Sequence, residues 1–221
     1  MPSRLARFLP LAAAAGLVST ALFIYGYLID DYWLRILAKP FPVLAMILAV
    51  EVLGDSDRYA RTIQIGLGLC IFGDIFLQIG DSTFLPGMIA FLLGHLAYIV
   101  AFLGRNRRLR PLEAIPFLCW TGWAAVTLWP HLGEMRIPVL AYTAVIFVMM
   151  WRATAMLAGE RRPTGWDWAA LTGALLFGFS DTLIALDRFH APIDGVRIPI
   201  IVTYWLGQLL IAASTLVDRP G

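Results

Sequence analysis

Charged side chains are scarce in this chain of 221 residues. Asp, Glu, Lys and Arg together make up 14% of it, whereas about a quarter is usual in a soluble domain. Hydrophobic residues make up 60%, and the mean hydropathy is +0.76. This composition excludes a water-soluble globular domain. It also excludes an intrinsically disordered chain, which combines low hydrophobicity with high net charge.

Lysine and cysteine are rare as well. Of the 17 basic residues only Lys39 is a lysine. No basic stripe with interleaved aromatic residues is present, so we expect no nucleic-acid partner. The two cysteines, Cys70 and Cys119, lie inside apolar runs. They exclude a disulfide scaffold, and we interpret both as buried, unreactive thiols.

Long apolar runs make up most of the sequence. A helix needs about 20 predominantly apolar residues to cross a bilayer, and the sequence contains eight such stretches joined by short connections. We therefore predict an all-α integral membrane protein, with residues 1–221 forming one eight-helix transmembrane bundle. The first run reaches Leu28 without a cleavage site, so we expect an uncleaved span. The predicted spans are residues 8–28, 32–52, 62–79, 84–103, 112–129, 136–157, 168–187 and 197–217.

The arginines predict the orientation of the bundle. With eight spans, twelve of the 17 basic residues fall on one side of the membrane, and the positive-inside rule makes that side cytoplasmic. Both termini are then cytoplasmic. The twelve are Arg4, Arg7, Arg58, Arg61, Arg105, Arg107, Arg108, Arg110, Arg152, Arg161, Arg162 and Arg219; the other five are Arg35, Lys39, Arg136, Arg188 and Arg197.

The chain also resembles itself. Phe72–Asp74, late in the third span, is echoed by Phe179–Asp181, late in the seventh. Each is followed by a second acid and then by a helix with a polar pair on one face: Asp81, His95 and Tyr98 in the first half, and Asp187, Tyr204 and Gln208 in the second. We predict two parallel four-helix repeats, at about 8–103 and 112–217. A pseudo-two-fold axis would bring Asp74 and Asp181 towards each other.

The two buried aspartates are the strongest functional signal. An ionisable group inside a bilayer is expensive and is usually functional. Asp74 and Asp181 lie about two-thirds of the way along their spans from the cytoplasmic side. Nearly all intramembrane polar residues lie at the centre or in the outer half, which predicts a cavity open towards the external side or outer leaflet. The alternative is a structural ion pair, for example with Lys39.

The other polar residues allow two interpretations each. His95, Tyr98, Tyr204 and Gln208 either line a site or only join helices by hydrogen bonds. Arg188, at the outer end of its span, either binds a ligand or anchors the helix at the interface. We predict no metal, because only His95 is intramembrane and no His or Cys spacing suits zinc.

Five short motifs follow one another along most of the chain: Lys39–Pro40, Phe72–Leu77, Gly94–Tyr98, Phe179–Ala185 followed by Asp187–Phe189, and Tyr204–Leu209. Together they resemble the YhhN-like lysoplasmalogenase family of polytopic membrane hydrolases. The resemblance implies cleavage of the vinyl ether bond of lysoplasmalogens to fatty aldehyde and glycerophosphoethanolamine or glycerophosphocholine. It implies a lysophospholipid substrate among membrane lipids, no cofactor, and a multi-pass protein of the bacterial inner membrane.

The chemistry suits the two aspartates. Vinyl ether hydrolysis needs a carboxylic acid that protonates the outer alkene carbon and an anion that stabilises the resulting oxocarbenium ion and activates water. Two neighbouring carboxyl groups in a low-dielectric cavity do not both ionise readily, so one stays protonated. We expect Asp74 and Asp181 to be the catalytic couple. Because a coupled pair shares its titration, the sequence leaves open which one is the acid.

The substrate-binding residues follow from their depth in the membrane. We expect His95, Tyr98, Tyr204 and Gln208 to orient water and the glycerol hydroxyl. Lys39 and Arg188, nearer the outer surface and with Asp187 beside Arg188, would receive the headgroup phosphate. The competing view is that Lys39 pairs with an aspartate.

Two other functions remain open from the sequence. A transporter of a small amphiphile would also have repeats, glycine-rich helices and a polar midplane. A structural scaffold is the weaker alternative, since it gives the buried carboxylates no role. The oligomeric state and the headgroup preference are not determined.

Overall fold

The structure, a computed structural model, describes residues 9–54, 57–158 and 163–216; Arg4, Arg7, Arg161, Arg162 and Arg219 lie outside them. These ranges contain helices and no strand, which confirms the predicted all-α fold. The α-helices are α1 (Leu9–Leu28), α2 (Tyr32–Ala38), α3 (Phe41–Leu53), α4 (Arg58–Ile79), α5 (Phe84–Arg105), α6 (Pro111–Leu128), α7 (Arg136–Thr154), α8 (Gly165–Ala185) and α9 (Arg197–Ala213). Each predicted span therefore coincides with a helix, if α2 and α3 are taken together.

Several helices begin where a side chain caps the free backbone N–H groups. Asp31 accepts a hydrogen bond from the Leu34 N–H at the start of α2, and Asp57 accepts one from the Ala60 N–H at the start of α4. Such caps satisfy donors that have no partner within the helix.

The second span is broken at Lys39–Pro40. Pro40 has no N–H to continue the hydrogen bonding of α2, so α2 ends at Ala38 and α3 begins at Phe41. The break places Lys39 between the two helices, with its side chain directed at α4, where it forms an ion pair.

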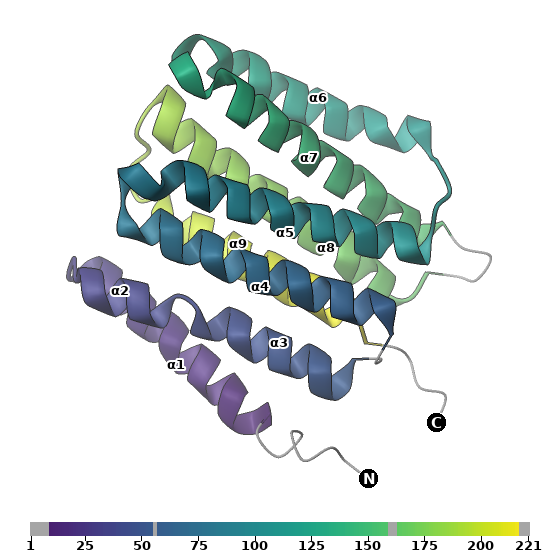
Figure 1. The fold of residues 1–221 in the computed structure, drawn as a ribbon, viewed down its shortest axis with the longest axis horizontal. Helices are drawn as coiled ribbons and strands as arrows, with labels where there is room; N and C mark the ends of the chain where they lie inside the picture. Colours follow the sequence, from purple (N-terminus) through teal and green to yellow (C-terminus); the bar gives the residue numbers. More distant parts are fainter. Residues whose placement is uncertain (1–8, 55–56, 159–162, 217–221) are drawn as a thin grey trace.

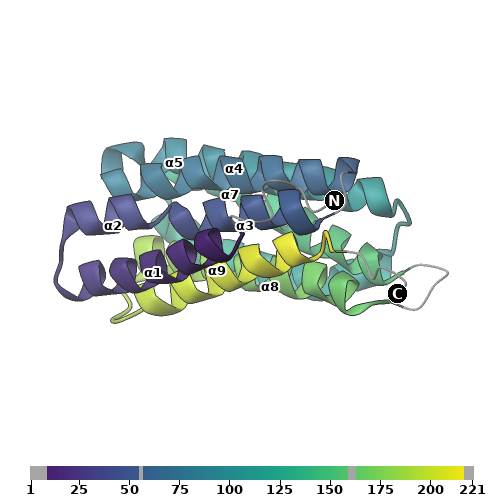
Figure 2. The ribbon, with the colours of Figure 1, turned by 90° about the horizontal axis from the view of Figure 1, so that it is seen from below.

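The helices form one elongated bundle (Figure 1). The α4–α5 and α8–α9 hairpins are its most closely packed pairs, and α3 contacts both α4 and α9. On the other side, α7 contacts α5 and α8, and α6 packs against α7. Turning the bundle shows α4 and α5 in one layer and α8 and α9 in another (Figure 2).

In both hairpins the two helices approach each other closely at glycines. A Cβ at Gly94 of α5 would lie 3.1 Å from the Gly66 carbonyl oxygen of α4. In the second hairpin, a Cβ at Gly173 of α8 would lie 2.7 Å from the Gly207 carbonyl oxygen of α9. Real Cβ atoms essentially never show the 2.7 Å distance and rarely show the 3.1 Å distance, so both crossings favour residues without a side chain.

The two ends of the bundle differ in charge. The turns after α3 and α5 lie at one end, and α9 ends on the same side (Figure 1). We call this the arginine-rich end, because Arg58, Arg61, Arg105, Arg107, Arg108 and Arg110 are located there. The turns after α1, α4, α6 and α8 lie at the opposite end.

The outer surface is strongly apolar. Ile137, Leu112 and Val126 are each more than three-quarters exposed, as expected for side chains that face lipid. Within the described ranges, six helical segments are long and apolar enough to cross a membrane, if α2 and α3 are counted as one. The α6 helix is not among them, and α9, with 17 residues, is shorter. A multi-pass membrane protein follows from these helices, while eight crossings, the repeats and the side of the termini stay predictions.

Candidate functional site

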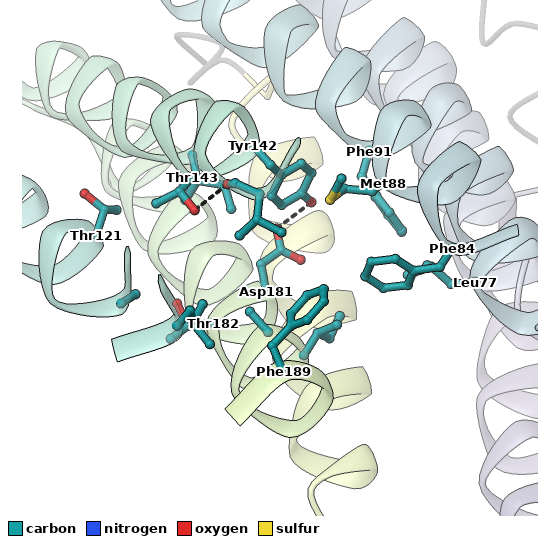
Figure 3. A pocket seen from close by; sticks show the side chains of 16 residues that line it. Leu77, Phe84, Met88, Phe91, Thr121, Tyr142, Thr143, Asp181, Thr182 and Phe189 are labelled. Carbon is teal, nitrogen blue, oxygen red and sulfur yellow. Dashed lines mark hydrogen bonds between the residues drawn. The ribbon is translucent and has the colours of Figure 1, made fainter. Parts of the chain in front are cut away.

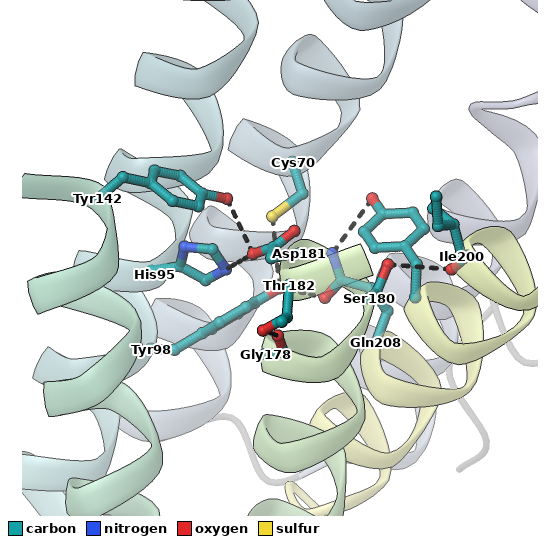
Figure 4. Close-up of polar contacts among 11 residues, drawn as sticks. Cys70, His95, Tyr98, Tyr142, Gly178, Ser180, Asp181, Thr182, Ile200 and Gln208 are labelled. Atoms are coloured by element: carbon teal, nitrogen blue, oxygen red, sulfur yellow. Dashed lines mark hydrogen bonds and ion pairs between the residues drawn. The ribbon is translucent and has the colours of Figure 1, made fainter. Parts of the chain in front are cut away.

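Both aspartates singled out by the sequence are buried inside the bundle. The Asp74 residue on α4 is 1% exposed and the Asp181 residue on α8 is 9% exposed. Each is contacted by side chains from other helices, and Figure 4 shows those around Asp181. Their partners differ in kind.

Asp74 has a cationic partner. Lys39 Nζ lies 3.1 Å from Asp74 Oδ1, and the two side chains are only 12% and 2% exposed. On the other carboxyl oxygen, Tyr204 of α9 donates a hydrogen bond of 2.7 Å to Oδ2. This environment stabilises an ionised carboxylate, because a buried charge needs a paired charge and hydrogen bonds.

Asp181 is contacted by a tyrosine and a histidine. Tyr142 of α7 donates a hydrogen bond of 2.9 Å to Asp181 Oδ2. His95 Nε2 of α5 lies 3.6 Å from the same oxygen, too far for a good hydrogen bond. Among the residues that the structure describes, neither ring nitrogen of the fully buried His95 has a hydrogen-bond partner. No lysine or arginine of these ranges forms an ion pair with Asp181.

A chain of hydrogen bonds extends from the Asp74 side of the site. Tyr98 Oη donates to Gln208 Oε1 (2.5 Å), and Gln208 Nε2 donates to Tyr204 Oη (3.3 Å). The Phe177 ring, one helical turn before Asp181, contacts a partner of each aspartate. Its centroid is 4.5 Å from that of His95 and 5.2 Å from that of Tyr204. The two carboxyl groups thus belong to one packed cluster.

A cavity of about 60 Å³ opens beside Asp181 (Figure 3). This volume holds a few water molecules. Its walls come from α4, α5, α6, α7 and α8 and are mostly apolar. Asp181, Tyr142 and three threonines supply its polar groups: Thr121, Thr143 and Thr182. Asp74 is not part of this lining, so Asp181 is the carboxyl group that faces the cavity.

Two of the predicted site residues lie away from the aspartates, beyond the end of α8. A π-helical turn, Leu186–His190, carries both Asp187 and Arg188. Asp187 Oδ1 accepts a hydrogen bond from the Ile193 N–H, and Arg188 forms an ion pair with Asp81.

The structure therefore divides the predicted residues into two groups. Around the aspartates it brings together Lys39, His95, Tyr98, Tyr204 and Gln208. Asp187 and Arg188 lie nearer the end of the bundle that is opposite the arginine-rich end. In the described ranges, no group of three or more His, Cys, Asp or Glu side chains could hold a metal ion.

Sequence reasoning missed Tyr142. Tyrosine is common in membrane helices, and nothing in the residues around it marks it. The predicted repeat contained the one available signal, since it pairs the second span, which carries Lys39, with the sixth span, which carries Tyr142. Each of these residues contacts the aspartate of the following span.

Comparisons with known proteins agree with the motifs. The sequence model of the YhhN family matches residues 34–215. A human protein named lysoplasmalogenase TMEM86B is 33% identical over 83% of this chain and 76% of its own length. Lysoplasmalogenase TMEM86A of Bos taurus is 36% identical over 85% and 80%, and a lysoplasmalogenase of Mycobacterium bovis is 33% identical over 79% and 67%. No solved structure matches the chain.

Proposed function

Since the chain belongs to the YhhN family, we propose that it is a lysoplasmalogenase, a membrane hydrolase that cleaves the vinyl ether bond of lysophospholipids. The observation that carries the proposal is the pair of buried carboxyl groups with unlike partners, one of them facing a cavity. The products are a fatty aldehyde and a glycerophospho-alcohol with an ethanolamine or choline headgroup.

The reaction needs one proton donor and one water molecule. The donor adds a proton to the outer alkene carbon, the C=C π electrons form the new C–H bond, and the cation is shared between the inner carbon and the ether oxygen. Water then attacks the inner carbon and returns a proton to the carboxylate that donated the first one, which gives a hemiacetal. Breakage of the bond between that carbon and the ether oxygen, with transfer of the hemiacetal hydroxyl proton to the ether oxygen, releases aldehyde and the glycerol hydroxyl.

We assign the acid to Asp181. It borders the cavity in which an alkene can lie, and its neighbours Tyr142 and His95 are uncharged donors or aromatic surfaces that tolerate a protonated carboxyl group. Burial without a cation disfavours the ionised form. Tyr142 positions the carboxyl group by its hydrogen bond.

We assign the anion to Asp74. The Lys39 ammonium and the Tyr204 hydroxyl stabilise its negative charge, which in turn opposes ionisation of Asp181 and stabilises the oxocarbenium ion. The observed ion pair favours the role of charge partner for Lys39 over that of phosphate ligand. We therefore assign the binding of the headgroup phosphate to Arg188, which lies nearer the end of the bundle.

The proposal extends to the orientation in the membrane. The arginine-rich end would face the cytoplasm by the positive-inside rule. Asp181 lies late in α8, in the half near the opposite end, so the cavity would serve the outer leaflet of the inner membrane.

Purified protein in detergent tests the activity, because no compartments exist there for transport. With a lysoplasmenyl-ethanolamine substrate we expect stoichiometric release of aldehyde and glycerophosphoethanolamine. In D2O, the aldehyde should carry one deuterium on the carbon next to the carbonyl, where the alkene was protonated. Binding of the substrate without turnover would contradict the proposal and favour a transporter.

A further inference from the structure

Asp81 and Arg188 form an ion pair near the end of the cavity that is remote from the arginine-rich end. Arg188 Nη1 lies 2.9 Å from Asp81 Oδ1, and the Asp81 side chain is 90% exposed. The guanidinium carbon lies 3.9 Å from the centroid of the Phe84 ring, and both Phe84 and Phe189 line the cavity. The pair thus sits next to aromatic walls of the space that Asp181 faces.

The spacing along α8 fits a phospholipid. Arg188 follows Asp181 by seven residues, which is about 10 Å along a helix at 1.5 Å per residue. In the proposed substrate, seven covalent bonds separate the outer alkene carbon from the phosphorus atom. They span roughly 9 Å when extended, at 3.8 Å for three bonds. A lipid protonated by Asp181 can therefore place its phosphate at Arg188.

We propose that Asp81 and Arg188 together form a subsite for a zwitterionic headgroup, in which Arg188 binds the phosphate and Asp81 binds the ammonium group. This inference rests on the proposed function and makes Asp81 a specificity-determining residue. A phosphate joined to an ammonium by two carbons carries a negative and a positive charge. These charges are complementary to the Arg188 guanidinium and the Asp81 carboxylate, which lie side by side. The headgroup can therefore replace each partner of the ion pair with an equivalent one.

The position of the pair makes this exchange easy. An ion pair between exposed side chains contributes little to stability, and Asp81 in particular loses almost no contact with the protein when Arg188 turns to a phosphate. Arg188 keeps its place through the Phe84 ring. Asp187 is less suited to the ammonium, since one of its oxygens already accepts the Ile193 N–H.

The subsite predicts a preference between headgroups. A headgroup with phosphate alone, or with phosphate and glycerol, brings negative charge to Asp81 without an ammonium to balance it. We expect the wild-type enzyme to have a several-fold lower KM for alkenyl-glycerophosphoethanolamine than for alkenyl-glycerophosphate with the same chain.

Steady-state kinetics of purified variants with these two substrates test the assignment. Asp81→Asn should raise KM severalfold for the ethanolamine substrate and leave it unchanged or lower for the phosphate substrate, with kcat retained for both. Arg188→Gln should raise KM for both. Asp194→Asn, which removes an exposed acid at the same end of the bundle, is the matched control and should change neither. Thermal unfolding of each variant verifies the fold.

A double variant that exchanges the two charges distinguishes headgroup recognition from a purely structural ion pair. In Asp81→Arg with Arg188→Asp, the ion pair can form again with reversed polarity. Loss of the headgroup preference in this double variant supports the subsite, whereas recovery of wild-type KM values would overturn it. Equal KM changes for both substrates in Asp81→Asn would also overturn it. If wild-type protein released no aldehyde from either substrate, the proposed function itself would fail.

Discussion

Lys39 Nζ lies 3.1 Å from Asp74 Oδ1. This ion pair connects the break between α2 and α3 with a buried residue of α4. The corresponding partner of Asp181 is a tyrosine hydroxyl. Asp74 thus has a charged partner, whereas Asp181 has a neutral hydrogen-bond donor. This difference is the physical basis for separating an ionised carboxylate from a protonated one.

The aspartates should act as a unit. Asp74→Asn and Asp181→Asn should each lower kcat by at least about 10²-fold, the lower range for acid–base groups. The double variant should be little worse than either single variant, because groups that act together are not additive. Rates of aldehyde release give the comparison, and wild-type turnover in either single variant would rule out the couple.

Lys39→Met should lower kcat and leave KM nearly unchanged. It leaves the buried Asp74 carboxylate without its cation, and breaking a buried pair from one side destabilises by about 3–5 kcal/mol. Lys39→Arg retains the charge and should retain more activity and stability. Adding Asp74→Asn to Lys39→Met should recover stability without activity. A raised KM with unchanged kcat would instead show that Lys39 binds the headgroup.

Tyr142→Phe should lower kcat about tenfold, since a hydrogen bond to an acidic group contributes about 1.5 kcal/mol and 1.36 kcal/mol corresponds to a factor of ten. The ring packing against His95 is kept. Tyr59→Phe is a matched control, because it removes another buried tyrosine hydroxyl, one that is hydrogen-bonded to Ser214 near the arginine-rich end. Equal kcat values in the two variants would contradict a positioning role for Tyr142.

Gly173→Ala should lower the midpoint of thermal unfolding by several degrees. The added Cβ would meet the Gly207 carbonyl oxygen at 2.7 Å, and a backbone atom cannot move aside as a side chain can. Gly68→Ala on α4, where no atom lies within 4 Å of the new Cβ, should be neutral or slightly stabilising. A melting curve of Gly173→Ala identical to wild type would show that the α8–α9 crossing does not depend on glycine.

Cysteine labelling tests the orientation. Our interpretation of both cysteines as buried is wrong for Cys119, which is exposed, so a Cys119→Ser background is needed. The remaining Cys70 is buried and should not react. A membrane-impermeant thiol reagent added outside intact spheroplasts should label Glu134→Cys, at the opposite end, and should label Arg107→Cys only after lysis. The reverse pattern would invert the proposed topology.

The sequence alone determined the class of the fold and the positions of its helices. Long apolar runs leave a bilayer as the only medium in which they are stable, and a helix satisfies every backbone polar group within itself. For the same reason, Asp74 and Asp181 stood out, because a charge within such a run requires a specific partner. The break between α2 and α3 likewise has a local cause, because Pro40 has no N–H to continue the helix.

Tertiary structure decided which groups meet. The pairing of Lys39 with Asp74, the contact of Tyr142 with Asp181 and the ion pair between Asp81 and Arg188 join residues on different helices. Helical periodicity gives the face on which a residue lies, but the rotation of one helix against the next depends on how glycines and bulky rings fit at each crossing. That fit is a property of the whole bundle, and it alone distinguishes the two aspartates.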